Sequence, residues 1–230
     1  VLGNAGDISL IQNMDDDILL YPPVLERSFY LLRMLKPKYR KAILGAGMMS
    51  KERRYLQQEK GAFYEDSAVI FGKINHRFFD LRCTGSISAN EVSGNVNYTA
   101  WWYACIPSAI IHEHNLPMPF FVHYDDVEYG MRNISNGLLL LNGICVWHPD
   151  PTNKSPFWMA YYDTRNRLIT MFTRGVSRRD LTGYLLRLLK KFLARIIRCQ
   201  YTDAGLILKG AQDFFKGPSR FIAFEPLDPR

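Results

Sequence analysis

The stretch Ile8-Ser-Leu-Ile-Gln-Asn-Met-Asp-Asp-Asp17 passes from an apolar run directly into three carboxylates. A run of this length followed by an abrupt polar change is typical of a short buried strand. Alternate side chains at a strand end face the same way, so Asp15 and Asp17 can converge while Asp16 points elsewhere or caps the following turn. Two converging carboxylates require a cation or a basic group between them. A divalent ion on a diphosphate is one interpretation, and a solvated acidic turn is the other.

The residues after the triplet predict a helix, so that the beginning of the chain forms a β-then-α unit. Pro22-Pro23 suits a helix start, and Lys36-Pro37 ends the pattern. Apolar residues recur between them at helical spacing: Val24, Leu25, Phe29, Leu32 and Leu35. A glycine-rich strand is predicted over 42–49, and a polar, aromatic region follows over 51–97.

Two further apolar runs end in residues suited to metal binding or acid-base chemistry. Phe120-Phe-Val122 leads into Asp125-Asp126, and a strand predicted over 138–147 ends at His148. Ligands of an open α/β sheet bind beyond the carboxyl ends of its strands. Together with the Asp15–Asp17 triplet, the runs therefore predict one site at one edge of an α/β sheet.

Each of these features also has a plainer interpretation. Asp125-Asp126 is either a helix cap favoured by the helix dipole or a general base beside a carboxylate that fixes the substrate. Trp101-Trp102 belongs to an aromatic strand predicted over 98–106, where only one ring of an adjacent pair can face the core. The other ring would suit the apolar face of a sugar. His148 is either a metal ligand or an ordinary core histidine.

Composition sets limits on the class of protein. The 230 residues are 47% hydrophobic and 22% charged, which excludes a disordered or fibrous chain. Four cysteines form no C-x-x-C pair, so we predict reduced thiols in the cytosol and no zinc finger. No window approaches the ~20 apolar residues of a membrane-spanning helix. Because the chain opens at Val1 inside an approach to a strand, we expect a fragment whose natural N-terminus lies upstream.

Five motifs occur in the order found in family 2 glycosyltransferases, and the resemblance covers roughly residues 8 to 173. They are Met14-Asp-Asp-Asp-Ile18, Trp101-Trp-Tyr-Ala-Cys-Ile-Pro107, Phe121-Val-His-Tyr-Asp-Asp-Val-Glu-Tyr-Gly-Met-Arg132, Trp147-His148 and Tyr161-Tyr-Asp-Thr-Arg-Asn-Arg167. The sequence most resembles bacterial galactofuranosyltransferases, with rhamnosyltransferases as neighbours. The resemblance implies a GT-A fold, with a mixed sheet flanked by helices, and cytoplasmic synthesis of a cell-surface polysaccharide.

The resemblance also implies a role for each site residue. Asp15, Asp17 and His148 would hold Mn²⁺ or Mg²⁺ on a nucleotide-diphospho-sugar donor, with Asp16 beside the donor. Asp126 would be the catalytic base of an inverting transfer. The acceptor glycan would contact three residues: Trp101, Trp102 and Asp125. The first β-α units of the family, which hold the nucleotide, are missing here, so we expect the given chain to bind the donor weakly.

The C-terminal part predicts two helices, over 158–173 and 178–198. The second carries an apolar stripe among many basic residues: Leu181, Leu185, Leu188, Phe192 and Ile196. We predict domains at 1–173, the metal and acceptor part of the transferase, and at 174–230, a basic helical extension. The stripe either docks on the inner face of a membrane, where a lipid-linked acceptor would lie, or packs against the catalytic domain.

Two other functions fit parts of the pattern. The net charge of +7 and the aromatic content suggest a nucleic-acid binder, but the basic residues gather in one late helix and the aromatic pairs lie near acidic clusters that repel phosphate. We therefore predict no nucleic-acid partner. The remaining alternative is a non-catalytic carbohydrate-binding or assembly module of the same fold.

Overall fold

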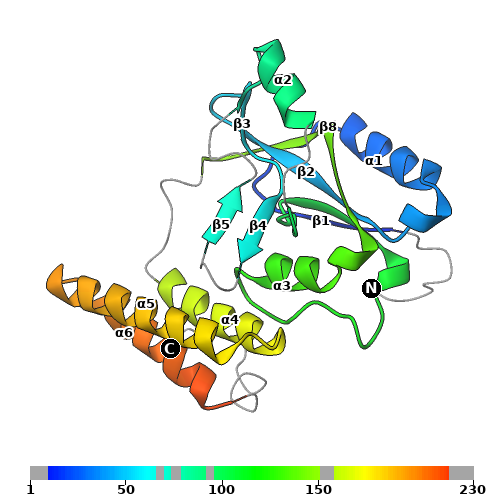
Figure 1. Ribbon diagram of the computed structural model, residues 1–230. Coiled ribbons are helices and arrows are strands. Elements are labelled where there is room, and N and C mark those ends of the chain that lie inside the picture. Colours follow the sequence, from blue (N-terminus) through cyan, green and yellow to red (C-terminus); the bar gives the residue numbers. More distant parts are fainter. Residues whose placement is uncertain (1–9, 66–69, 74–78, 92–95, 151–157, 218–230) are drawn as a thin grey trace. The chain divides into compact units, whose positions relative to one another are not determined.

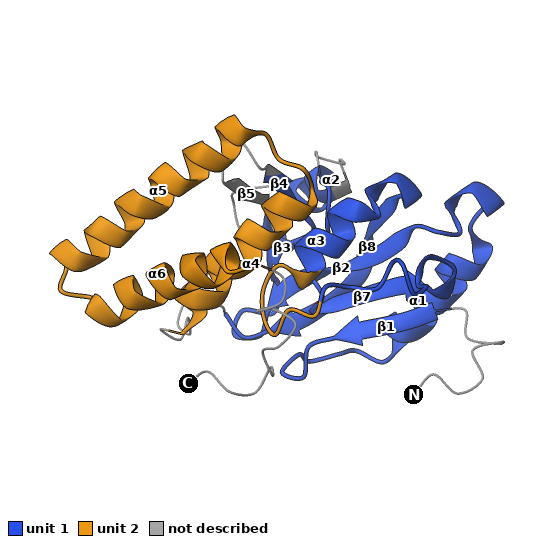
Figure 2. Cartoon of the chain, turned by 90° about the horizontal axis from the view of Figure 1, so that it is seen from below, with its two compact units in different colours: residues 1–64, 70–118, 126–151 blue, residues 65–69, 119–125, 152–230 orange. Residues whose placement is uncertain are grey.

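The computed structural model describes residues 10–65, 70–73, 79–91, 96–150 and 158–217 (Figure 1). The chain divides into two compact units, coloured separately in Figure 2. The first unit comprises residues 1–64, 70–118 and 126–151, and the second comprises residues 65–69, 119–125 and 152–230. The predicted domain boundary at residue 173 stays a prediction.

The first unit is built on a six-stranded mixed sheet. Its strands are β1 (Leu10–Met14), β2 (Ile43–Ser50), β3 (Leu56–Glu59), β6 (Phe79–Asp80), β7 (Tyr103–Pro107) and β8 (Leu138–His148). The order is β1-β7-β2-β3-β6, with β8 parallel to β2 and the other described pairs antiparallel. A separate two-stranded sheet is formed by β4 (Ala62–Glu65) and β5 (Ile70–Lys73). The mixed α/β prediction is confirmed, although the sheet is mostly antiparallel.

Alternation along β2 sends side chains into two different clusters of the core. Leu44 packs with Val24 and Leu32 of α1 (Pro23–Met34), and with Tyr103 of β7. Ile43 instead packs in a cluster with Tyr129 of α3 (Asp125–Arg132). Both clusters contain almost fully buried residues, so β2 is covered along its length and its burial explains the apolar, glycine-containing sequence.

The region between residues 51 and 97 contains structure that its polar composition does not predict. Beside β3 to β6, the short helix α2 (Thr84–Glu91) forms there. Single turns of 3-10 helix lie at η1 (Pro37–Tyr39), η2 (Ser108–Ile110) and η3 (Ile134–Asn136).

One predicted strand and one apolar run that precedes a predicted site differ from the expectation. The aromatic strand expected over 98–106 begins only at Tyr103, because Tyr98 bridges to Ala62 whereas Tyr103 pairs with Met14, and the chain turns between these two partners. Phe120–Val122 is not a strand. His123 has a φ of 60°, and the next residue also has a positive φ, so the extended backbone is broken just before α3 begins.

The second unit contains three helices among its described residues: α4 (Met159–Thr173), α5 (Arg178–Ile197) and α6 (Tyr201–Phe215). The helices predicted over 158–173 and 178–198 are confirmed, and α6 was not predicted. Ser177 caps α5 by accepting a hydrogen bond from the backbone N–H of Asp180 at 3.2 Å. No helix in the described ranges is long and apolar enough to cross a membrane.

A tyrosine and a glycine fix how closely α4 and α6 pack. A Cβ atom added to Gly210 would lie 2.6 Å from the backbone oxygen of Tyr161, so α6 can approach α4 this closely only with glycine there. The Tyr161 hydroxyl donates to buried Asp213 at 3.0 Å. The shared core of the three helices includes Leu168, Met171, Tyr184, Leu188 and Ile207.

Candidate functional site

The strand directions bring the ends of β1 and β8 to one edge of the sheet. Both β1 and β2 run antiparallel to β7, so β1 and β2 point the same way, and β8 is parallel to β2. The carboxyl ends of these strands therefore share an edge. Asp15 follows β1 directly, and His148 is the last residue of β8. Two of the three predicted runs thus end at one edge, as expected of an α/β site. The third, Phe120–Val122, is not a strand, and the aspartates after it begin helix α3.

Backbone hydrogen bonds hold the acidic turn against this edge. The N–H of Asp15 donates to the carbonyl of Trp102 at 3.3 Å. Four residues later, Leu19 and Trp147 exchange two backbone hydrogen bonds of 2.7 and 3.1 Å, which join the turn to β8 immediately before His148. The turn between these two anchors therefore has little freedom to move its carboxylates away from the imidazole.

Asp15, Asp17 and His148 form a compact group of potential metal ligands. One ligand atom from each lies within 4.8 Å of the other two. The Nε2 atom of His148 is 3.2 Å from an oxygen of Asp17 and 3.7 Å from an oxygen of Asp15. The imidazole is 19% exposed and the two carboxylates are about half exposed, at 54% and 47%, so the group opens to solvent. Asp16 is exposed in the same turn and is not a member of the group.

A hydrogen bond at Nδ1 of His148 determines whether Nε2 presents a proton or a lone pair to the two carboxylates. Its Nδ1 lies 2.7 Å from the backbone oxygen of Pro149. A carbonyl can only accept, so Nδ1 carries the proton, and in neutral imidazole Nε2 presents a lone pair. That lone pair then faces carboxylate oxygens, an arrangement that requires a proton or a metal ion between them. Backbone anchoring of the distal nitrogen is typical of metal-ligating histidines. The two carboxylates suit Mn²⁺ or Mg²⁺, whereas the imidazole nitrogen suits softer divalent metals.

The two tryptophans lie in the turn before β7, and both are half-buried. The ring N–H of Trp102 donates to the carbonyl of Ala46 at 3.2 Å, and its ring packs on the core cluster shared with α1. Trp101 packs on the other cluster and meets the ring of Tyr129 edge-on, with centroids 5.8 Å apart. The backbone bond from Asp15 to Trp102 makes the tryptophan pair a neighbour of the acidic turn. An acceptor subsite at the pair stays a prediction.

Asp125 and Asp126 form the first turn of α3, and both side chains are half-buried. A carboxylate oxygen of Asp126 accepts a hydrogen bond from the backbone N–H of Val127 at 2.7 Å. This contact agrees with the plainer interpretation of a carboxylate at a helix start. It leaves acid-base chemistry open, because a carboxylate has further lone pairs to offer.

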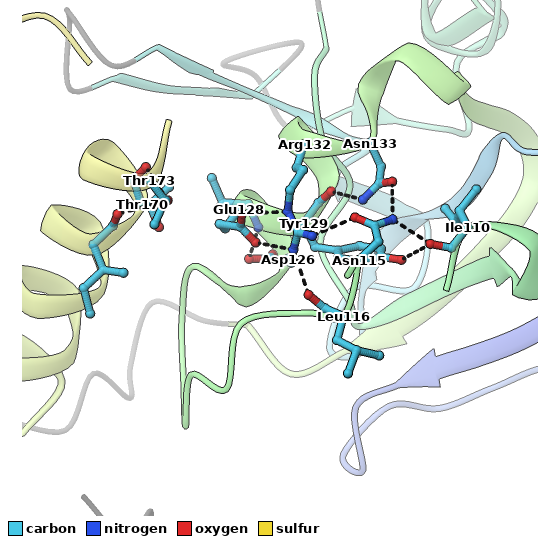
Figure 3. Close-up of polar contacts among 12 residues, drawn as sticks. Ile110, Asn115, Leu116, Asp126, Glu128, Tyr129, Arg132, Asn133, Thr170 and Thr173 are labelled. Atoms are coloured by element: carbon cyan, nitrogen blue, oxygen red, sulfur yellow. Dashed lines mark hydrogen bonds and ion pairs between the residues drawn. The ribbon is translucent and has the colours of Figure 1, made fainter. Parts of the chain in front are cut away.

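Glu128 and Arg132 hold α3 in place, a role that the sequence did not predict. Glu128 is 3% exposed and accepts two hydrogen bonds from Arg132, at 2.9 and 2.8 Å. Arg132 also donates to Asn115 at 2.7 Å and to the backbone of Leu116 at 2.9 Å (Figure 3). The i, i+4 spacing of Glu128 and Arg132 was the available signal. Its tertiary partners lie 16 and 17 positions away, where no local pattern points to them.

Comparison with known proteins shows a distant relationship. No family model matches the sequence. Galactofuranosyltransferase GlfT2 of Mycobacterium tuberculosis is 26% identical over 231 residues, which cover 94% of this chain and 36% of the relative. GlfT2 of Mycolicibacterium smegmatis is 24% identical over 230 residues, covering 94% and 35%. The chain is thus a distant relative of glycosyltransferases and spans about a third of the length of the proteins it matches.

Proposed function

We propose that this chain carries the metal and acceptor part of an inverting, metal-dependent glycosyltransferase. The observation that carries the proposal is the convergence of Asp15, Asp17 and the Nε2 lone pair of His148 at one sheet edge. The distant similarity to galactofuranosyltransferases supports it from an independent direction. The donor would be a nucleotide-diphospho-sugar, and galactofuranose or a rhamnose-like sugar is the unit we propose it transfers.

In this proposal the three clustered side chains bind Mn²⁺ or Mg²⁺, which would neutralise charge on the leaving diphosphate. Asp15 and Asp17 supply hard oxygen ligands, and the Pro149 carbonyl keeps His148 in the tautomer that can ligate. Asp16, exposed in the same turn, is proposed to contact the donor.

Asp126 is the proposed base. Its carboxylate would take the proton of an acceptor hydroxyl while the hydroxyl oxygen bonds to the anomeric carbon and the bond from that carbon to the diphosphate oxygen breaks. Attack opposite the leaving group inverts the anomeric configuration. Asp125 and the rings of Trp101 and Trp102 are proposed to position the acceptor glycan. The product would belong to a cell-surface polysaccharide assembled from the cytoplasmic side.

Calorimetric titration with Mn²⁺ alone tests the metal cluster. We expect Asp17→Asn and His148→Ala each to weaken Mn²⁺ binding at least about tenfold, since each removes one of three ligands. Glu26→Gln is the matched control, because Glu26 is an exposed carboxylate in the first turn of α1. Unchanged affinity in both cluster variants would refute the metal assignment.

Asp126→Ala tests the chemistry separately. In a preparation that transfers sugar from a nucleotide-diphospho-sugar to an oligosaccharide, this variant should lose turnover while its affinity for Mn²⁺ and for the donor stays the same. Normal transfer by Asp126→Ala would show that another group is the base. Oligosaccharide binding without metal-dependent cleavage of the donor would favour a non-catalytic carbohydrate-binding module.

A further inference from the structure

Helix α5 has one apolar stripe that is already covered. Tyr184 and Leu188 are buried in the core of the second unit, and Leu181, Leu185 and Phe192 pack against that core. The sequence leaves this stripe two possible partners, the inner face of a membrane or the catalytic domain. The structure favours packing for this stripe, because Leu181, Leu185, Leu188 and Phe192 contact the other helices of the second unit. The fifth residue of the stripe, Ile196, is 37% exposed.

A second apolar stripe on the same helix is exposed. Leu186, Leu189, Leu193 and Ile197 are 56%, 52%, 49% and 81% exposed. At 3.6 residues per turn, these four positions fall within an arc of about 80° on the helix surface. Helices of globular proteins normally turn one apolar face to the core and a polar face to water. Four large apolar side chains in line on the outer side therefore indicate a surface that is covered in use.

Basic residues follow this outer stripe along one side. Arg187, Lys190, Lys191 and Arg198 are all exposed, and they occupy roughly the next 100° of the helix surface. Residues 174–217 contain ten Lys and Arg against three Asp, so the net charge of this segment is +7, equal to that of the whole chain. The basic flank supplies four of these ten cations, and they lie beside the exposed leucines.

We propose that the outer stripe of α5 docks on an anionic lipid bilayer, with Leu186, Leu189, Leu193 and Ile197 inserted at the interface and the basic flank against lipid phosphates. The combination of an exposed apolar arc with adjacent Lys and Arg is the pattern of an interfacial helix. From Leu186 to Ile197 the stripe is about 17 Å long at 1.5 Å per residue. That length suits a helix lying in the membrane plane and is well short of the ~30 Å hydrocarbon core.

Charge argues against a second copy of the chain as the occupant. Pairing two outer stripes face to face would bring two basic flanks to one interface, side by side in an antiparallel pair and on opposite sides in a parallel pair. Like charges at an interface oppose association. An anionic surface instead gains from the same residues, since each Lys or Arg near it strengthens binding about fivefold. The proposal goes beyond the proposed function and does not depend on it, because it concerns only α5 and its charge.

Vesicle co-sedimentation tests the docking surface. The 230-residue chain is mixed with vesicles of phosphatidylcholine alone or with about a third phosphatidylglycerol. We expect binding to the anionic vesicles at least tenfold tighter than to the neutral ones, and weakening as salt screens the lipid charge. Equal binding to both vesicle types, or no binding to either, would overturn the proposal.

Two pairs of variants separate the apolar and charged contributions. Leu189→Ser with Leu193→Ser should weaken binding to anionic vesicles at least tenfold, whereas Leu25→Ser with Met34→Ser, two exposed apolar residues of α1, should not. Because all four side chains are exposed, the fold should persist, and far-ultraviolet circular dichroism checks it. Equal effects of the two pairs would contradict a specific docking face.

The charge variants use the same design. Lys190→Gln with Lys191→Gln should weaken binding to anionic vesicles by more than tenfold, at about fivefold for each cation. Lys36→Gln with Lys38→Gln, two exposed lysines that precede β2, removes the same charge elsewhere and should change binding much less. One combined outcome would refute the bilayer and assign the stripe to a second copy of the chain. In it the wild type does not bind lipid but dimerises, and the double variant Leu189→Ser with Leu193→Ser no longer dimerises.

Discussion

The buried ion pair between Glu128 and Arg132 should control where α3 lies, and Glu128→Gln tests this directly. Glu128 is 3% exposed and accepts two hydrogen bonds from the guanidinium, while the Arg132 side chain is 32% exposed. Glutamine keeps the shape of the side chain. It removes the charge and turns one acceptor into an NH₂ donor that faces an arginine N–H.

The expected loss of stability follows from these contacts. Removing one partner of a buried, hydrogen-bonded ion pair costs about 3–5 kcal/mol. Arg132 retains its bonds to Asn115 and Leu116 and is partly solvated, so the lower end of that range applies. About 3 kcal/mol corresponds to a fall in Tm of roughly 6–12 °C for a chain of this size.

Thermal unfolding followed by near-ultraviolet circular dichroism measures this change, because Trp101 packs on Tyr129 of α3. Glu26→Gln, the exposed carboxylate on α1, is the control and should change stability by less than about 0.5 kcal/mol. Glu128→Gln should leave Mn²⁺ affinity unchanged, since the metal cluster lies on other elements. A loss below about 1 kcal/mol would refute the view that this pair anchors α3.

Three further changes test the stability of one unit at a time. Gly210→Ala should destabilise the helical unit by about 2 kcal/mol in chemical denaturation, since its Cβ would meet the backbone oxygen of Tyr161 at 2.6 Å. The control, Gly205→Ala, places its Cβ where nothing lies within 4 Å and should be neutral or stabilising. Equal effects of the two substitutions would contradict the close approach of the helices. Ser177→Ala should cost about 1 kcal/mol of α5 stability by removing its cap, measured by helical circular dichroism on heating, and an unchanged melting curve would argue against the cap. Burial raises the pKa of the Cys105 thiol from 9.0 to about 11, so the unfolded chain releases this proton first and stability should fall by about 2 kcal/mol as pH rises from 9 to 11. Cys105→Ala should reduce that pH dependence, and an identical profile would exclude the thiol as its source.

Local pattern was enough to predict that Asp15, Asp17 and His148 lie together. An apolar run followed by Asp15-Asp16-Asp17, and a second run ending at His148, specify strands whose ends carry ligands. Parallel directions then bring those ends together, as the structure confirms. Period and length also specified α1, α4 and α5, because helical spacing of apolar residues depends on the local sequence alone.

Local pattern failed where a segment's partner is distant in the chain. Trp101 and Trp102 look like strand residues by composition, but the change of partner from Ala62 to Met14 places them in a turn. The positive φ values at His123 and Tyr124 likewise break a run that looks extended. Hydrogen bonds between remote segments decide both cases, and no residue-by-residue preference contains that information.

Helix α5 shows most clearly which properties follow from local sequence and which follow from tertiary packing. The sequence by itself determined that this segment is a capped, basic helix rich in leucine, because capping, propensity and charge are properties of neighbouring residues. Its leucines occupy two arcs, and either arc could have faced inward. Only the surfaces of α4 and α6 decided that Leu188 is buried and Leu189 exposed, because burial depends on which partner surface is present and complementary.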